Sequence, residues 1–496
     1  MFFVYVILEE YINDNFRKDT FCQKLSSFVV STSNVFGCVK RLKNDQAFWD
    51  AYEKSKNNII KERCFIMITI KDHYPVIDQT IQQVKDRFGS DSKIAVMFEN
   101  CISNTLQTTI KVLDDGSIFV ITGDIPAMWL RDSACQLRPF LFFAKEDPEI
   151  ADIISGLIQK QMQCIQIDPY ANAFNECANG NCWEHDKTDM KPELWERKFE
   201  IDSLCFPVQL SYLFWKNTGY TAHFTMDWLK SAKTIISVFR TEQDHEHKSP
   251  YTFERMNCVP TDTLSRNGKG ALVKSNIGLI WSGFRPSDDS CTYGYLIPSN
   301  MLASVILENI SEIAEQIYHD SVLAAEAHQF SSDLRKAIES LSIVPGQSKE
   351  FYAYEIDGFG EYNIMDDANL PSLLSLPYIG YCDRKDGRYL NTREIILSDR
   401  NPYYYAGACA KGIGSPHTPA RYIWHIGLAM QALTTTSAKE REQLLDTLTH
   451  TDAGTDLMHE AFLVDDPAQY TRPWFSWANS VFCELILDCC GYHLEM

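Results

Sequence analysis

The sequence predicts a mainly α-helical protein, arranged as a helical bundle or an α/α-barrel with a pocket at one end. Apolar residues recur at helical spacing in one stretch after another, whereas alternating, strand-like stretches are few and brief. The longest connections, over residues 250–290 and 356–371, are rich in glycine, proline, asparagine and aspartate. Helices in pairs with such loops between them would gather polar and aromatic side chains at one end.

The expected elements begin with a β-hairpin. Residues 108–113 and 117–121 flank Asp114-Asp115-Gly116, which is typical of a tight turn between two short strands. Apolar stripes over 150–158 and 302–313 then have the three- and four-residue spacing of a helix face. Further helices are predicted over 210–216, where Gly219 is a C-cap signal, and over 321–341, 422–433, 439–448 and 474–487.

Composition excludes several classes of partner. The chain has 496 residues, 45% of them hydrophobic, which is enough for a large core, and its net charge of −20 argues against a nucleic-acid partner. No apolar run is long enough to cross a membrane, so no membrane partner is expected. Residues 1–8 are apolar but lack a basic flank and run into Glu9 and Glu10, which makes a poor signal peptide.

The cysteines favour a reducing compartment. There are 16 of them, scattered and without zinc-site spacing, and several stand in apolar stretches where free thiols commonly pack. Because disulfides belong mainly to oxidising compartments, this usage favours the cytoplasm over secretion. We expect no metal and no cofactor.

Residues 121–133, Ile-Thr-Gly-Asp-Ile-Pro-Ala-Met-Trp-Leu-Arg-Asp-Ser, are dense in groups that bind sugars. An indole such as that of Trp129 packs on the apolar face of a pyranose, and charged groups such as Arg131 and Asp132 take hydroxyls in pairs. The same residues also fit a core segment with an ordinary ion pair. Residue types alone leave both interpretations open, although charged side chains are rarely buried without a partner or a purpose.

A second motif, residues 281–289, places Asp288 and Asp289 after Trp281 and Arg285. Adjacent carboxylates repel one another, so one of them can keep its proton to higher pH and act as an acid. Ser-Asp-Asp after proline is also good helix-capping chemistry, which by itself is the commoner explanation. In residues 365–372, Asp367 and Asn369 fit either sugar contacts or a loop cap.

The last two motifs contain a histidine, a tryptophan and a glutamate. His417 and Trp424 follow the glycines of a tight loop at 412–414 and are candidates to face a ligand, although a lone histidine is usually structural. Glu460, in Met-His-Glu-Ala-Phe, precedes the aromatic stretch 472–479 and is a candidate general base, although a glutamate on a helix surface is commoner. His459-Glu460 lacks the second histidine of a zinc helix, which excludes a metalloprotease motif.

Together these motifs closely resemble glycoside hydrolase family 125. The resemblance is carried in order by residues 122–133, 281–289, 366–372, 413–419 and 458–462, and it extends from about residue 76 to about residue 487. It implies a mainly α fold, an (α/α)6 barrel with short β-hairpins in the loops, over a catalytic domain at 71–496. Residues 1–70 are left as an N-terminal extension of unknown role. The implied activity is that of an exo-acting α-1,6-mannosidase that inverts the anomeric centre of a mannose-containing oligosaccharide without a metal.

The resemblance also implies roles for individual residues. Glu460 would be the base that deprotonates the attacking water, and Asp288 or Asp289 the acid, with Asp288 preferred. The acid must hold its proton at working pH, which repulsion by the neighbouring aspartate would favour. The implied sugar contacts are Trp129, Arg131 and Asp132, with Arg285, Asp367, Asn369, His417 and Trp424 as further neighbours. A barrel glycosidase acting on α-glucosides and a glycan-binding protein without activity are the two alternatives.

Overall fold

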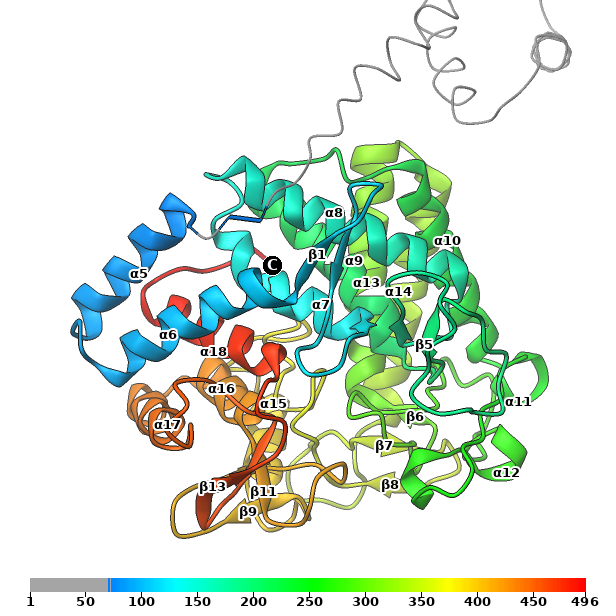
Figure 1. Cartoon of the computed structure of the whole chain (residues 1–496). Coiled ribbons are helices and arrows are strands. Elements are labelled where there is room, and N and C mark those ends of the chain that lie inside the picture. The colour runs from blue at the N-terminus through cyan, green and yellow to red at the C-terminus, as the bar shows by residue number, and fades with distance from the viewer. Residues whose placement is uncertain (1–69, 72) are drawn as a thin grey trace, which may run out of the picture. The chain divides into compact units, whose positions relative to one another are not determined.

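The fold is mainly helical, with short antiparallel strands in the connections between helices (Figure 1). The computed structural model describes residues 70, 71 and 73–496. The predicted extension at 1–70 and the expected lack of a signal peptide therefore lie outside the described residues, apart from Ile70. Within the described residues no helix is both long and apolar enough to span a membrane.

Five helices are buried on nearly every side. They are α7 (Leu130–Leu137), α9 (Ile201–Thr218), α13 (Ile297–Ile313), α16 (His425–Thr434) and α18 (Ser476–Cys489). A helix that is buried all round has to be enclosed by others, and these five pack on one another in the order α16, α18, α7, α9 and α13. Between α13 and α16 the chain forms buried turns at residues 371–381.

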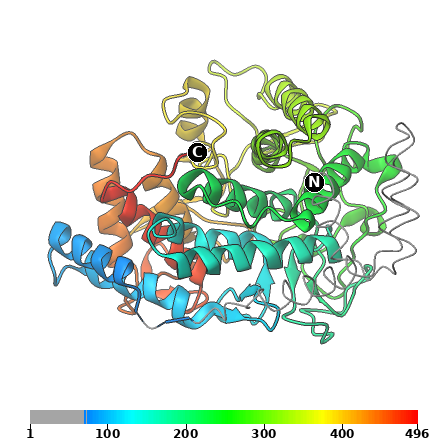
Figure 2. The same cartoon turned by 90° about the horizontal axis from the view of Figure 1, so that it is seen from above.

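The remaining long helices have one buried and one exposed face. They are α5 (Pro75–Phe88), α6 (Lys93–Asn104), α8 (Pro148–Ile167), α10 (Met226–Glu242), α14 (Ser321–Leu341), α15 (Gly387–Ile396) and α17 (Ala438–His450). Amphipathic α6, α14 and α17 cover α18, α13 and α16 respectively. In the view from above, long teal and green helices lie side by side, in agreement with the packing of α8 on α9 and α10 (Figure 2).

Short elements complete the chain. The short helical turns are Thr105–Thr109, Arg138–Phe142, α11 (His245–Lys248), Pro260–Asp262, α12 (Ser265–Gly268) and Ala314–Tyr318. The described strands form two hairpins and three small three-stranded sheets, all antiparallel. The hairpins are β1 (Ile110–Val112) with β2 (Ile118–Val120), and β9 (Tyr404–Ala406) with β10 (Lys411–Ile413). The three sheets are β3 (Met128–Trp129), β4 (Ala173–Phe174) and β5 (Leu194–Glu196); β6 (Tyr295–Leu296), β7 (Glu355–Ile356) and β8 (Tyr362–Asn363); and β11 (Tyr422–Trp424), β12 (Ala461–Leu463) and β13 (Asp466–Tyr470).

Three of these strands lead straight into buried helices. Helices α7, α13 and α16 each begin at the residue after β3, β6 and β11, and α9 begins five residues after the end of β5. The sheets therefore fix the direction in which the chain enters the core. The residues at each strand-to-helix junction are placed at the N-terminal ends of the buried helices.

The helix and hairpin predictions agree with the structure in position but differ at several boundaries: α9 begins at Ile201 where the prediction began at 210, α18 begins at Ser476 where it began at 474, and β1 begins at Ile110 where it began at 108. The hairpin is confirmed with Ile110 opposite Val120, and Gly219 is the left-handed C-cap of α9, with φ of 78°. The helix predicted over 422–433 is wrong at its start, because residues 422–424 pair with β12 as a strand and the helix begins at His425. Tyr, Ile and Trp all favour strands, so this boundary follows from the residue types.

Candidate active site

Most of the predicted site residues line one cavity of about 610 Å³ at the N-terminal ends of α7, α16 and α18. Nine of the eleven predicted residues lie on its wall: Trp129, Arg131, Asp132, Asp288, Asp289, Asn369, His417, Trp424 and Glu460. Further lining residues not predicted as contacts include Trp183, Lys198, Arg255, Asp262, Arg472 and Trp477. Five sequence motifs thus meet at one place.

Arg285 and Asp367, the other two predicted residues, lie behind this wall. The Arg285 guanidinium donates from Nε to Glu355 Oε1 at 2.6 Å, and the fully buried Asp367 accepts from Asn369 Nδ2 at 2.9 Å and Ser415 Oγ at 3.1 Å. Arg285 thus ties its loop to strand β7, and Asp367 ties its loop to the one that carries Ser415, so both hold in place the loops that form the wall. Neither side chain lines the cavity, so the positions of Arg285 and Asp367 do not match the prediction that they contact the sugar.

The loop that carries Asp288 and Asp289 is a turn, and no helix begins there, so the capping interpretation is wrong. Asp288 has a positive φ of 66°, which is uncommon for a residue with a side chain and which points the two carboxylates at different partners. Asp289 accepts from Ser287 Oγ at 3.1 Å and lies 3.7 Å from His417 Nδ1. Asp288 accepts from Asn172 Nδ2 at 3.2 Å.

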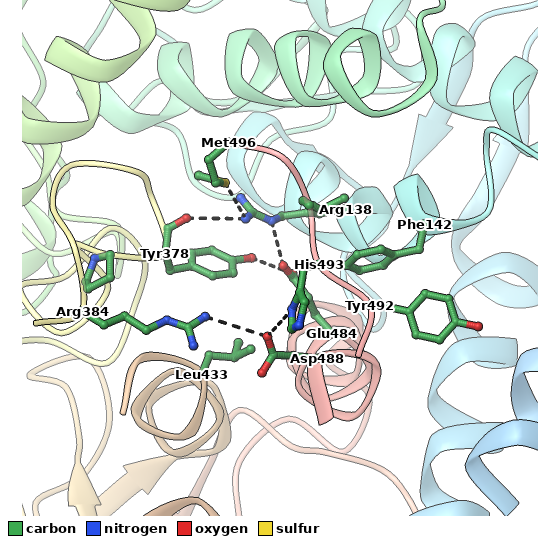
Figure 3. Close-up of a pocket in the computed structure, with 12 residues that line it drawn as sticks. Arg138, Phe142, Tyr378, Arg384, Leu433, Glu484, Asp488, Tyr492, His493 and Met496 are labelled. Atoms are coloured by element: carbon green, nitrogen blue, oxygen red, sulfur yellow. Dashed lines mark hydrogen bonds and ion pairs between the residues drawn. The ribbon is translucent and has the colours of Figure 1, made fainter. Parts of the chain in front are cut away.

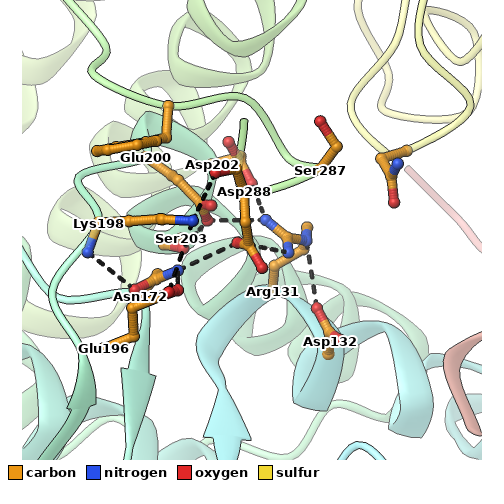
Figure 4. A network of polar contacts seen from close by, with 12 residues as sticks. Arg131, Asp132, Asn172, Glu196, Lys198, Glu200, Asp202, Ser203, Ser287 and Asp288 are labelled. Atoms are coloured by element: carbon orange, nitrogen blue, oxygen red, sulfur yellow. Dashed lines mark hydrogen bonds and ion pairs between the residues drawn. The ribbon is translucent and has the colours of Figure 1, made fainter. Parts of the chain in front are cut away.

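Arg131 is the centre of a cluster of carboxylates, shown in Figure 4. Its Nη1 donates to Glu200 Oε2 at 2.8 Å and to Asp202 Oδ2 at 3.1 Å, its Nε lies 3.2 Å from Asp132, and its Nη2 lies 4.0 Å from Asp288. These side chains are buried except that of Asp288, which is 22% exposed. One cation is therefore surrounded by four carboxylates, more negative charge than it can balance.

Lys198 supplies a second buried cation. Its Nζ donates to Asp262 Oδ1 at 2.6 Å and to the backbone oxygen of Asp288 at 2.7 Å, and it lies 3.5 Å from Glu196. Burial lowers the pKa of this amine, but the surrounding carboxylates outweigh it and raise the pKa, so Lys198 stays charged. Neither Lys198 nor the carboxylates of residues 196–202 were among the sequence candidates. The only indication of these residues in the sequence was a run of charged side chains directly before an apolar helical stretch.

The environment moves the pKa values of two pocket carboxyls in opposite directions. Burial raises the pKa of Asp132 to about 6, against the opposing charge of Arg131. Burial also acts to raise the pKa of Asp288, but the Lys198 charge, a hydrogen bond with Glu200 and the Arg131 charge together lower it to about 2. The expected rise of the Asp288 pKa through repulsion by Asp289 is therefore wrong, because Lys198, Glu200 and Arg131 together favour the ionised form of Asp288.

Glu460 stands on another part of the wall, directly before β12. It is buried, with Arg472 Nη1 3.7 Å from its Oε1, and Arg472 itself is held by Asp124 through an Nε to Oδ1 hydrogen bond of 3.0 Å. Burial lowers the pKa of His417, but Asp289, Glu460 and Asp288 raise it to about 9. In the described part of the chain no group of three or more His, Cys, Asp or Glu side chains is arranged to hold a metal ion.

A helical fold with a cavity lined by carboxyls, arginines and indoles is the pattern of a carbohydrate-cleaving hydrolase. A bacterial glucoamylase complexed with acarbose superposes with a TM-score of 0.51 at 12% identity, over 80% of this chain and 55% of that chain, which shows a shared fold. The model of the metal-independent α-mannosidase family, glycoside hydrolase family 125, matches residues 91–487, and the chain belongs to this family.

Two relatives cover most of the chain. A metal-independent α-mannosidase from Streptococcus pneumoniae, solved as a non-productive substrate complex with α-1,6-mannobiose, is 45% identical with a TM-score of 0.82, over 85% of this chain and 99% of that chain. The meiotically up-regulated gene 157 protein of Schizosaccharomyces pombe is 42% identical over 440 residues, 84% of this chain and 86% of that protein. The chain is accordingly a glycoside hydrolase of the α-mannosidase class. The family match favours mannosides over the α-glucosides that the motifs left open.

Proposed function

We propose that this chain is an exo-acting α-1,6-mannosidase that releases terminal mannose from N-glycan-type or similar oligosaccharides with inversion. The observation that carries the proposal is that Asp288 and Glu460, 172 positions apart in the sequence, line the same cavity. The α-1,6 linkage is supported by the mannobiose held by the Streptococcus pneumoniae relative.

The reaction assigns one carboxyl to each side of the glycosidic bond. Glu460 removes a proton from a water whose oxygen attacks the anomeric carbon from the face opposite the leaving sugar, while Asp288 gives a proton to the leaving oxygen as the bond breaks. Inverting glycosidases keep the two carboxyls roughly 6.5–9.5 Å apart to leave room for that water. The product would be β-mannose, and no step needs a metal.

The cavity also supplies the groups that would hold the terminal mannose. The indole nitrogens of Trp129 and Trp477 are buried and have no acceptor among the described residues, so a sugar hydroxyl can fill that role. Asp132 and Arg131 offer charged hydrogen bonds, which bind hydroxyls strongly. These groups lie deep in the core, at the start of buried helices. Such a position favours binding the end of a sugar chain over binding its middle.

The helix pairing supports the (α/α)6 barrel. Along the chain, six helices with one buried and one exposed face alternate with six buried segments. The first set is α6, α8, α10, α14, α15 and α17, and the second is α7, α9, α13, residues 371–381, α16 and α18. We infer that these twelve segments form the six helix pairs of such a barrel, with turns in place of the fourth inner helix. The free thiols of the described cysteines support the cytoplasm as its location.

The test uses purified protein with α-1,6-, α-1,3- and α-1,2-linked mannobiose, with and without EDTA, followed by proton NMR of the released anomer. Rapid, chelator-resistant release of β-mannose from the 1,6 isomer alone is expected. Release of α-mannose would overturn inversion, and release from another isomer alone would overturn the linkage.

The proposed base has its own test. Glu460→Gln should lower kcat by about 10²–10⁴-fold, the usual contribution of a general base, while mannoside binding persists. Binding is measured by calorimetry with α-1,6-mannobiose. Turnover close to that of the wild type would remove Glu460 from the mechanism.

A further inference from the structure

The carboxyls of Glu200 and Asp288 are neighbours on the same guanidinium. Arg131 approaches Glu200 with Nη1, at 2.8 Å, and Asp288 with Nη2, at 4.0 Å. Because both nitrogens belong to one planar group, the two acids lie side by side in the cluster of Figure 4. Glu200 is fully buried, whereas the Asp288 side chain keeps some exposure and lines the cavity.

The two oxygens of Glu200 differ in their surroundings. Oε2 accepts hydrogen bonds from Arg131 Nη1 and from Ser203 Oγ, each at 2.8 Å. Oε1 is buried and receives no hydrogen bond from an amide, hydroxyl or guanidinium of the described residues. A buried carboxylate oxygen with no donor is costly, which is explained if this oxygen carries a proton itself.

The carboxyl beside it completes that explanation. Asp288 is the acid next to Glu200 on Arg131, and the pKa values of the two move apart, that of Glu200 raised and that of Asp288 lowered. Ionised carboxylates only accept hydrogen bonds, so a hydrogen bond between these two acids would require one proton within the pair. The charged groups that face the pair are the cations Arg131, Lys198 and His417 and the carboxylates of Asp132, Asp202, Glu196 and Asp289, with Glu460 and Arg472 across the cavity.

We propose that Glu200 is a positioning residue that stores the proton which Asp288 delivers to the leaving sugar oxygen. The inference rests on the proposed function, in which Asp288 is the acid. Glu200 would then be a source of protons that is buried from solvent and lies directly beside Asp288.

The proton has a defined path in each turnover. Burial raises the pKa of Glu200 well above its usual range, whereas the surrounding cations hold that of Asp288 low, so the proton rests on Glu200 before substrate binds. As the sugar displaces water, the proton passes to Asp288 and then to the glycosidic oxygen, which takes the electron pair of the breaking bond. Glu460 meanwhile gains a proton from the attacking water, and solvent returns one to the pair.

The experiment compares two substrates in the full-length protein. α-1,6-Mannobiose needs protonation of its leaving oxygen, whereas dinitrophenyl α-mannoside has a leaving group that departs without it. Glu200→Gln should lower kcat on mannobiose by about 10²-fold or more, the range for proton transfer by a positioned side chain, but leave the dinitrophenyl rate within about threefold. The high-pH limb of the kcat/KM profile should also move to lower pH, because Asp288 then faces cations without a partner that keeps its proton.

Asp202→Asn is the matched control, because it removes another buried carboxylate from Arg131 but keeps both acids of the pair. It should lower both rates by a similar factor and move the pH limb less than Glu200→Gln does. Glu200→Asp, which keeps a carboxyl, should recover part of the mannobiose rate, and it provides the same comparison if the glutamine variant fails to fold.

Equal losses on both substrates for Glu200→Gln, with an unmoved pH limb, would overturn the proposal and leave Glu200 with a structural role only. Asp288→Asn separates this result from a failure of the proposed function. If Asp288→Asn loses no more activity on mannobiose than on the dinitrophenyl substrate, Asp288 is not the acid, whatever Glu200 does.

Discussion

Two buried arginines, Arg131 and Arg138, differ in the balance of charge around them. They lie seven residues apart, about 10 Å along the helix direction, on α7 and in the turn that follows it. Arg131 is in contact with four carboxylates. Arg138 has one, Glu484, at 2.9 Å, and its guanidinium lies 3.9 Å from the ring centre of Tyr378, whose hydroxyl donates to the same Glu484 (Figure 3).

The difference separates a reactive cluster from a structural one. A one-to-one ion pair with its hydrogen bonds made is already neutral and needs no further group. The small cavity of about 100 Å³ beside Arg138 therefore receives no surplus charge from this ion pair. A cation with four carboxylates carries surplus negative charge, so protons or a ligand have to bind, and perturbed titration of this kind is concentrated at functional sites.

The largest expected effect is on stability, at Arg138. Arg138→Met leaves the Glu484 charge buried and unpaired, so the free energy of unfolding should fall by about 3–5 kcal/mol. Adding Glu484→Met should restore most of that loss, because two well-packed apolar side chains can replace a buried ion pair. Urea unfolding measures both variants. A double variant as unstable as the single one would show that the pair does more than balance its own charges.

Arg131→Met should act on catalysis instead. Loss of a preorganised charge at a reacting centre typically costs about 10²–10³-fold in kcat, and α-1,6-mannobiose hydrolysis would report it. Because the carboxylates it leaves behind can take up protons, its stability loss should be smaller at pH 5 than at pH 8. If Arg131→Met and Arg138→Met retain equal activity, the distinction between the two arginines fails.

The third prediction concerns the pH dependence of stability through Asp132. Its pKa in the folded protein, about 6, lies above the ordinary value of 3.8, so the folded state binds this proton more tightly than the unfolded state. The stabilisation of the folded state by this bound proton is fully present below about pH 4 and is lost as the pH rises through 6. Asp132→Asn should therefore gain about 2–3 kcal/mol of stability over the wild type at pH 8 and nothing at pH 4. Thermal or urea unfolding at both pH values checks it, and an equal gain at pH 4 would contradict it.

The smallest effect is expected at Trp183, which is 52% exposed although it lines the cavity. A ring left exposed beside a pocket is available to stack on the next sugar, worth about 0.5–1.5 kcal/mol. Trp183→Ala should raise the KM for mannobiose by roughly 2- to 10-fold, with unfolding unchanged within about 0.5 kcal/mol. Phe359→Ala, at an exposed ring outside the cavity, is the control. An unchanged KM would leave Trp183 without a part in binding.

The sequence was informative where function depends on residue type and local spacing. Apolar stripes predicted α8, α13 and α14, and the motifs contained nine of the residues that line the cavity. It was uninformative where burial decides the role. Glu200 and Lys198 stand in a run of charges that would be a solvated face on most helices, and only packing places them in the core. Arg285 and Asp367 show the reverse case, since they share motifs with pocket residues but lie behind the wall.

The position of α18 determines when activity arises during synthesis. Helix α18 packs against α6, α7 and the turn at Arg138–Phe142, and it supplies both Trp477, beside Arg131, and Glu484, the partner of Arg138. A nascent chain that has not yet emerged past residue 489 thus holds both arginines without these contacts. The first sugar can therefore be cleaved only after α18 has been synthesised and has packed onto α7.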